Sequence, residues 1–196
     1  MGASDILLRA APLLGRAQVL SRPCLIPAAS GVYGWWFDET PSGVPTAGCM
    51  TRDQWTLLYV GISPKAPPRN GTAASRQSLR TRVRYHYKGN AEGSTLRLTL
   101  GVLLSEQLDL QLRRVGSGVR RTFSAGETEL SAWMHDHSRI SFVEHPTPWT
   151  LEEELIGSLD LPLNLDQNTH HLFHSELSMR RRAAREVAAA LPVLPR

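Results

Sequence analysis

Four side chains in this sequence have the chemistry that phosphodiester hydrolysis needs, although they are far apart along the chain. Tyr33 and Tyr59 are phenols with an ordinary pKa of about 10, so neither is a good base unless a neighbouring cation lowers that value. Arg82 could supply the cation and contact a phosphate. Glu152 is a hard oxygen ligand, suited to Mg²⁺ held mostly by water and phosphate. The reaction needs an activated water, a counter-charge for the phosphate and stabilisation of the leaving oxyanion, and the chain has a candidate for each.

Each of these residues also has an ordinary structural interpretation. Tyrosines on strands are usually core residues, and an arginine on a helix is usually a solvated charge. Glu152 is expected in the first turn of a helix, where the helix dipole favours a carboxylate without any metal. The functional interpretation therefore depends on whether the fold brings the four side chains together.

Two apolar runs carry the tyrosines. Residues 30–37 and 57–62 are rich in β-branched and aromatic residues and are bounded by turn-forming ones, which predicts two neighbouring strands of one sheet. Trp35 and Trp36 are adjacent on the first strand. We therefore expect one ring to pack inward and Trp36 to face outward, where it could stack on an unpaired base. Each run is followed by a loop rich in Pro and Gly that is longer than a hairpin needs.

The rest of the chain is predicted to alternate helices with a hairpin and one more strand. Leu79 and Val83 share one face of the next helix, with arginines around the remainder. After the two strands the predicted order is a helix over 75–88, a helix over 94–108, a hairpin over 109–123, a helix over 124–134, a strand over 140–143, a helix opening with a capping box at Thr150, and a basic amphipathic helix over 175–191. This order predicts an α+β fold with a small mixed or antiparallel sheet flanked by helices.

Composition favours a cytoplasmic protein with an anionic partner. The 196 residues are enough for one domain with a sizeable core. The net charge of +4 decides little, but the 22 basic residues include only two lysines, Lys65 and Lys88. Arginine's planar fork suits phosphate oxygens, although a coding bias toward arginine would give the same composition. Cys24 and Cys49 suggest no disulfide framework, which favours a reduced setting.

The beginning of the chain does not have the pattern of a signal peptide. Asp5 stands where such a peptide would carry basic residues, and Arg9 and Pro12 interrupt the apolar stretch. No apolar run is long enough to span a bilayer. We therefore expect neither secretion nor a membrane anchor.

The order and local spacing of these motifs resemble the GIY-YIG nuclease family, in particular its stand-alone bacterial catalytic-domain proteins. Gly31-Val32-Tyr33 stands for the first signature triplet and Tyr59-Val60-Gly61 for the second. The family's arginine and histidine follow in the pattern Leu-x-x-Arg-x-x-x-His, which Leu79, Arg82 and His86 match.

Two further positions extend the resemblance toward the C-terminus. The family's metal-binding glutamate lies three residues before a Leu-Ile pair, which selects Glu152 over Glu153 and Glu154. Asn164 follows twelve residues later and matches the family's site-bracing asparagine, although it could also be a simple turn residue.

The resemblance implies a metal-dependent endonuclease that hydrolyses phosphodiester bonds in DNA. Tyr33 and Tyr59 would line the site, with one of them at or near the role of general base. His86 would be an auxiliary hydrogen-bonding residue near the phosphate, and Glu152 would hold Mg²⁺ or Mn²⁺. The residues predicted to contact substrate are Gly61, Arg80, Arg84, Arg180 and Arg181.

The implied organisation is a single GIY-YIG-like domain over 1–196. It divides into a catalytic core over about 28–168, an N-terminal helical extension over 1–24 and a C-terminal basic helix over 170–192. Many family members carry a lysine directly after the second triplet, where this chain has Ile62. That departure leaves open the alternative of a catalytically degenerate member that binds nucleic acid without cutting it. The oligomeric state is also left open.

The histidines allow a second, weaker interpretation. His170 and His174 are four residues apart, a spacing that places two imidazoles on one helix face as in some zinc sites. No cysteine or acidic ligand completes a zinc set nearby, so we expect no zinc. Either histidine could instead lie near the substrate.

Overall fold

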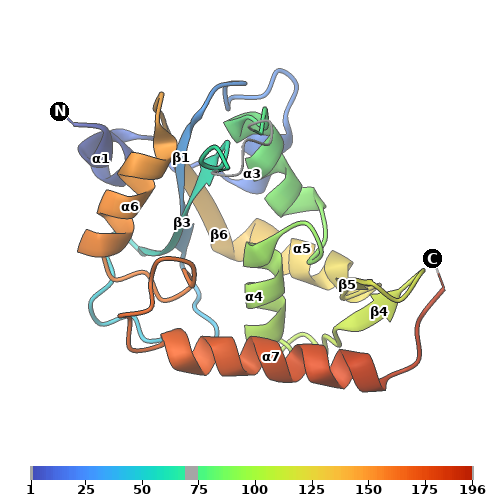
Figure 1. Cartoon of the computed structure of the whole chain (residues 1–196). Helices are drawn as coiled ribbons and strands as arrows, with labels where there is room; N and C mark the ends of the chain where they lie inside the picture. Colours follow the sequence, from blue (N-terminus) through green and yellow to red (C-terminus); the bar gives the residue numbers. More distant parts are fainter. Residues whose placement is uncertain (1, 69–74, 196) are drawn as a thin grey trace.

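The computed structural model describes residues 2–68 and 75–195, and its centre is an antiparallel sheet (Figure 1). The strands lie in the order β2 (Thr51–Arg52), β3 (Trp55–Ser63), β1 (Gly31–Phe37) and β6 (Ser138–Glu144). A separate hairpin comprises β4 (Arg113–Val115) and β5 (Arg120–Thr122), as the sequence predicts. The predicted α+β fold with a small sheet flanked by helices is confirmed, and every pair of neighbouring strands is antiparallel.

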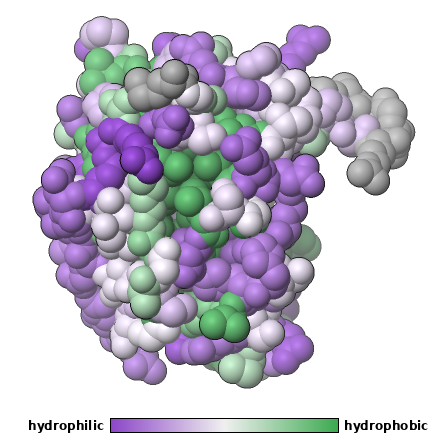
Figure 2. Space-filling model, turned by 90° about the vertical axis from the view of Figure 1, so that its left-hand side faces the viewer, coloured by the Kyte–Doolittle hydropathy of each residue, from purple (hydrophilic) through white to green (hydrophobic). Residues whose placement is uncertain are grey.

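Helices lie on both sides of the sheet (Figure 1). One face is covered by α1 (Ala3–Asp5), the short π-helix η1 (Ile6–Ala10) and α6 (Pro148–Ser158). On the other side lie α2 (Arg16–Leu20), α3 (Leu79–Lys88), α4 (Thr95–Leu103) and α5 (Gly126–His137). The long helix α7 (His174–Ala190) runs along the lower end of the molecule, against α4 and β4. The face that carries α6 is mostly hydrophilic, and its hydrophobic side chains gather in a hollow near the middle (Figure 2).

Strand β1 is buried on both of its faces. Tyr33, Trp35 and Phe37 point into the larger core beside α3 to α5, whereas Val32 and Trp36 point into the smaller core beneath α6 and η1. The expectation that Trp36 faces outward is wrong, since both tryptophans are 0% exposed. The error arose because strand alternation identifies two faces but does not reveal whether helices cover both.

Several helix boundaries differ from the sequence prediction, and one difference matters for the site. Helix α3 begins at Leu79 rather than at residue 75, because the Ser78 hydroxyl caps it by accepting the Thr81 amide hydrogen. Helix α6 begins at Pro148, the favoured position for proline in the first turn, and not at a capping box on Thr150. Glu152 therefore lies in the second turn of α6, beyond the first-turn reach of the helix dipole. The dipole does not explain this carboxylate.

Both ends of the described chain pack against the sheets. Leu14 forms a bridge with Ile140 on β6, and Leu194 forms a bridge with Val115 on β4. None of the described helices combines the length and the apolar character that crossing a bilayer requires. Part of the predicted loop over 63–74 lies outside the described residues.

Candidate active site

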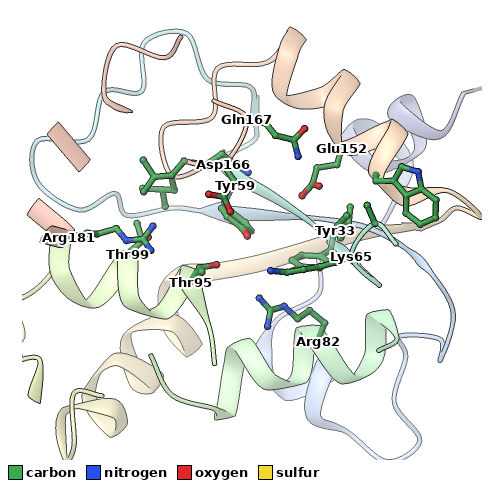
Figure 3. A pocket seen from close by; sticks show the side chains of 16 residues that line it. Tyr33, Tyr59, Lys65, Arg82, Thr95, Thr99, Glu152, Asp166, Gln167 and Arg181 are labelled. Atoms are coloured by element: carbon green, nitrogen blue, oxygen red, sulfur yellow. The ribbon is translucent and has the colours of Figure 1, made fainter. Parts of the chain in front are cut away.

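A cavity of about 350 Å³ opens between β3 and the helices α3, α4 and α6 (Figure 3). It brings together five residues that are up to 131 positions apart in the sequence: Tyr33, Tyr59, Arg82, Glu152 and Asn164. Arg82 and Glu152 approach the cavity from opposite sides, with the two phenols between them (Figure 3). All but one of the residues predicted as catalytic therefore line one space.

The register of β1 and β3 places both tyrosines on the same face of the sheet. Tyr33 pairs with Gly61, and Tyr59 lies two residues before that glycine on β3. A Cβ atom on Gly61 would lie 2.7 Å from the Tyr33 hydroxyl oxygen and 2.9 Å from Cε1 of Tyr59. The two phenols thus converge over the glycine, and a side chain at position 61 would occupy their space. Gly61 does not line the cavity; it makes room for the residues that do.

The phenols are neutral in this arrangement. Burial is the largest cause that raises the pKa of Tyr33, the neighbouring Tyr59 adds to it, and the guanidinium of Arg82 opposes it. Burial also raises the pKa of Tyr59. Both hydroxyl groups are therefore hydrogen-bond donors at neutral pH.

His86 lies behind Tyr33 and does not line the cavity. Its Nε2 is 2.9 Å from the Tyr33 hydroxyl oxygen, and its Nδ1 is 2.7 Å from the Ser94 hydroxyl oxygen. Burial lowers the pKa of His86 well below its ordinary value, with added repulsion from Arg82 and Arg97, so the ring is neutral. His86 is therefore not brought to the cavity wall, and its contact with the site runs through the Tyr33 hydroxyl.

Glu152 is the one glutamate of the run 152–154 that faces the cavity, whereas Glu153 and Glu154 are exposed. Burial, reinforced by the carboxylate of Asp166 and opposed by Lys65, raises the pKa of Glu152 to about 7. No hydrogen bond to another described residue contributes to this pKa. A partly buried carboxylate without a donor is unfavourable unless a cation compensates it.

Asn164 braces strand β3 at the point between Tyr59 and Gly61. Its Oδ1 accepts the Val60 amide hydrogen and its Nδ2 donates to the Val60 carbonyl, both at 2.9 Å. The side chain thus occupies the free edge of β3 as a neighbouring strand would. Asn168, which the sequence did not single out, donates to the backbone carbonyl of Asn164 and holds this loop.

Lys65 is the functional candidate that sequence reasoning missed. It lies three residues after Ile62, lines the cavity and acts on the pKa of Glu152. Its position as one of only two lysines was visible, but the sequence did not show that the loop turns it back toward the site. Lys65 thus brings positive charge to the cavity although residue 62, where many family members carry a lysine, is isoleucine. Other lining residues that were not predicted include the polar or aromatic Thr95, Thr99, Trp149, Asp166 and Gln167.

Among the arginines of α3, some make structural contacts and one lines the cavity. Arg80 donates to the Ile26 carbonyl at 2.8 Å, and Arg84 donates to the Val19 carbonyl at 2.9 Å. Both side chains hold the N-terminal segment, so the predicted substrate contacts at these positions are not brought to the cavity. Arg82 is the arginine of this helix that lines it.

The arginines of α7 also differ in where they point. Arg181 lines the cavity, whereas Arg180 pairs with Glu176 and lies over the ring of Phe173, away from it. His170 precedes the first residue of α7, so it does not share a helix face with His174. The described part of the chain contains no group of three or more His, Cys, Asp and Glu residues arranged to hold a metal ion.

The residues around Glu152 fit a hard divalent cation. The carboxylates of Glu152 and Asp166 and the side-chain carbonyl of Gln167 offer oxygen atoms to the cavity. Mg²⁺ and Mn²⁺ prefer such oxygen ligands, and Mg²⁺ is commonly held by one or two carboxylates together with water and phosphate.

The cavity thus combines two phenols with three cations and two carboxylates. The family model of the GIY-YIG catalytic domain matches residues 31–183, which is more than half of the chain. The chain belongs to the GIY-YIG family. No curated protein and no solved structure matches it.

Proposed function

We propose that this protein is an endonuclease that hydrolyses phosphodiester bonds in DNA with Mg²⁺ or Mn²⁺. The observation that carries the proposal is the position of Glu152. Its carboxylate, with a pKa raised to about 7, faces Arg82 across a cavity walled by Tyr33 and Tyr59. A phosphodiester would pair with the cations of this pocket, and a divalent cation would pair with its carboxylates.

The cation would be held by Glu152, with the oxygens of Asp166 and Gln167 beside it. When bound, it supplies neutralisation of the phosphate charge and stabilisation of the leaving oxyanion. Arg82 and Lys65 attract the phosphate and orient it in the cavity, because both are cations on its wall.

Tyr33 and His86 together can move a proton. In the tautomer with an unprotonated Nε2, His86 accepts a hydrogen bond from the Tyr33 hydroxyl at 2.9 Å. Tyr33 Oη takes a proton from the attacking water as it passes its own proton to Nε2 of His86, so no separate phenolate forms. Tyr59 lines the cavity beside Tyr33, and its hydroxyl donates a hydrogen bond to the water or to a phosphate oxygen.

The presence of Lys65 supports catalysis over a degenerate, non-cutting member. The only sequence feature in favour of that alternative was the isoleucine at position 62. Lys65 restores positive charge beside Glu152 from three residues further along the chain. The proposal also includes a single domain over 1–196 that works in the cytoplasm, where Cys24 and Cys49, both free thiols, would stay reduced.

Plasmid nicking in Mg²⁺ tests the proposal. The wild type should nick supercoiled DNA, EDTA should abolish nicking, and Glu152→Gln and Arg82→Gln should each lower the rate about 100-fold or more. Glu153→Gln is the matched control, because it removes the same charge from an exposed position of the same helix and should cut as the wild type does. Equal nicking by all four proteins would contradict the proposal.

A further inference from the structure

A second cavity, of about 550 Å³, adjoins the candidate active site beside α7. Arg181 and the segment 165–167 line both cavities, so the two spaces share a wall. The remaining lining residues of the second cavity are polar or basic: Thr169, His174, Ser178 and Arg185. A strand that leaves the first cavity along this shared wall would meet the second.

One face of α7 forms a continuous polar stripe along this cavity. His174, Ser178, Arg181 and Arg185 are spaced by four, three and four residues, which places them on one side of the helix. The stripe rises by about 16 Å, which matches the axial rise of four to five nucleotides in one strand of B-form DNA. Leu177 and other apolar residues of α7 pack into the core instead.

The two arginines of this stripe are free to bind an anion. Arg180 and Arg182 each pair with a glutamate one turn away on α7, whereas Arg181 and Arg185 form no ion pair within the described residues. Nε of Arg181 is buried and has no hydrogen-bond partner among the described residues. Arg181 and Arg185 are four residues apart on α7, so their guanidinium groups repel each other. Burial and this repulsion lower the pKa of Arg181, and the carboxylate of Asp166 opposes them. Phosphate oxygens would satisfy the free donors and relieve this repulsion.

We infer that the second cavity holds the phosphodiester backbone of one nucleic-acid strand next to the point of cleavage. Arg181 and Arg185 bind its phosphates, and the hydroxyls of Ser178 and Thr169 add neutral donors. Asp166 is the one carboxylate among the described lining residues and lies at the shared wall, so the phosphates bind beyond it, toward Arg185. This inference rests on the proposed function and adds the path that the strand takes from the site. Contacts of this kind fix the position of the strand and do not read its sequence.

Fluorescence anisotropy with a short single-stranded DNA oligonucleotide, in EDTA and over a range of NaCl concentrations, tests the inference. Arg185→Gln should weaken binding about tenfold and lower the slope of log K against log salt by about 0.7, the value for one phosphate contact on a single strand. Arg182→Gln is the matched control, because it removes the same charge from an exposed position of the same helix that pairs with Glu186. It should bind as the wild type does, and both variants should melt at the wild-type temperature.

The outcomes separate this inference from the proposed function. If the two variants weakened oligonucleotide binding equally, or if Arg185→Gln did not weaken it, the inference that a strand binds in the second cavity would be overturned. A wild type that does not bind the oligonucleotide would also overturn it. A wild type that binds with the predicted dependence on Arg185 but nicks no plasmid would support strand binding in the second cavity. The same result would contradict the proposed endonuclease activity.

Discussion

The hydroxyl oxygen of Tyr33 lies 2.9 Å from Nε2 of His86, a histidine that is fully buried and separated from the cavity by the tyrosine ring. The opposite ring nitrogen is held by Ser94, whose hydroxyl also accepts the Arg97 amide hydrogen. Ser94 therefore fixes the orientation of the imidazole, and the imidazole fixes the hydroxyl of Tyr33. His86 thus positions the Tyr33 hydroxyl, the proposed catalytic group, and does not itself line the cavity.

Replacing His86 by Leu should lower kcat about 100-fold and leave KM within a few-fold of the wild type, because the change removes the proton acceptor of Tyr33 but no contact with DNA. Tyr33→Phe should give a similar loss. The double variant should be no slower than the worse single one, since the two residues act as a unit. Steady-state kinetics on a labelled oligonucleotide measure this, and additive losses would show that His86 acts independently of Tyr33.

Gly61→Ala should damage both the site and the fold. Its Cβ would lie 2.7 Å from the Tyr33 hydroxyl and 2.9 Å from the Tyr59 ring, so both phenols must move. We expect a loss of about 1–3 kcal/mol in the free energy of unfolding, measured with urea, together with loss of cleavage. Gly157→Ala is the control, because a Cβ there meets nothing within 4 Å on an exposed helix. It should stabilise the protein by up to about 1 kcal/mol; equal effects of the two changes would refute the packing argument.

Lys65→Ala tests whether this lysine supplies the charge that position 62 lacks. Its ammonium group opposes the rise in the pKa of Glu152, so its removal should raise that pKa further. The acid limb of the profile of kcat/KM against pH should move to higher pH, and kcat/KM at neutral pH should fall about tenfold. Lys88→Ala removes the only other lysine, from an exposed position at the end of α3. An identical profile for both variants would remove Lys65 from the site.

The local elements could be predicted from the sequence, because their signals are local. The strands around Tyr33 and Tyr59, the glycine-centred hairpin and the helix that carries Arg82 follow from periodicity and turn residues. The predicted starts of two helices were wrong, because the Ser78 hydroxyl caps α3 and because α6 already begins at Pro148. The prediction that Trp36 is exposed failed because its burial depends on η1 and α6, which come from distant parts of the chain.

The candidate site shows the same division. The family pattern selected Arg82, Glu152 and Asn164, and the structure places all three at one cavity. The pattern could not separate the arginines of α3 by direction, because Arg80 and Arg84 differ from Arg82 only in the helix face on which they lie. Lys65 and Asp166 stayed hidden because loops position them, and no periodicity predicts the course of a loop.

Glu152 should make the stability of the metal-free protein depend on pH. Its pKa is raised from 4.5 to about 7 in the folded state, so between these values the folded protein binds more protons than the unfolded chain. Stability from this group is therefore lost as pH rises through that range. In EDTA, Glu152→Gln should gain melting temperature relative to the wild type between pH 5 and pH 8. Mg²⁺ should raise the melting temperature of the wild type at pH 8 and not that of the variant. If the melting temperatures of the wild type and Glu152→Gln changed in parallel with pH and with Mg²⁺, the assignment of Glu152 as the titrating metal ligand would be contradicted.

In the proposed function, Glu152 holds a divalent cation opposite Tyr33 and Arg82. Anomalous diffraction from crystals soaked in Mn²⁺ tests it most directly, with Glu152→Gln crystals treated in the same way. The account predicts an anomalous peak at the Glu152 carboxylate, inside the cavity that the two tyrosines line, and no peak there in the variant. A wild-type cavity without a peak, or a peak that survives the substitution, would contradict it.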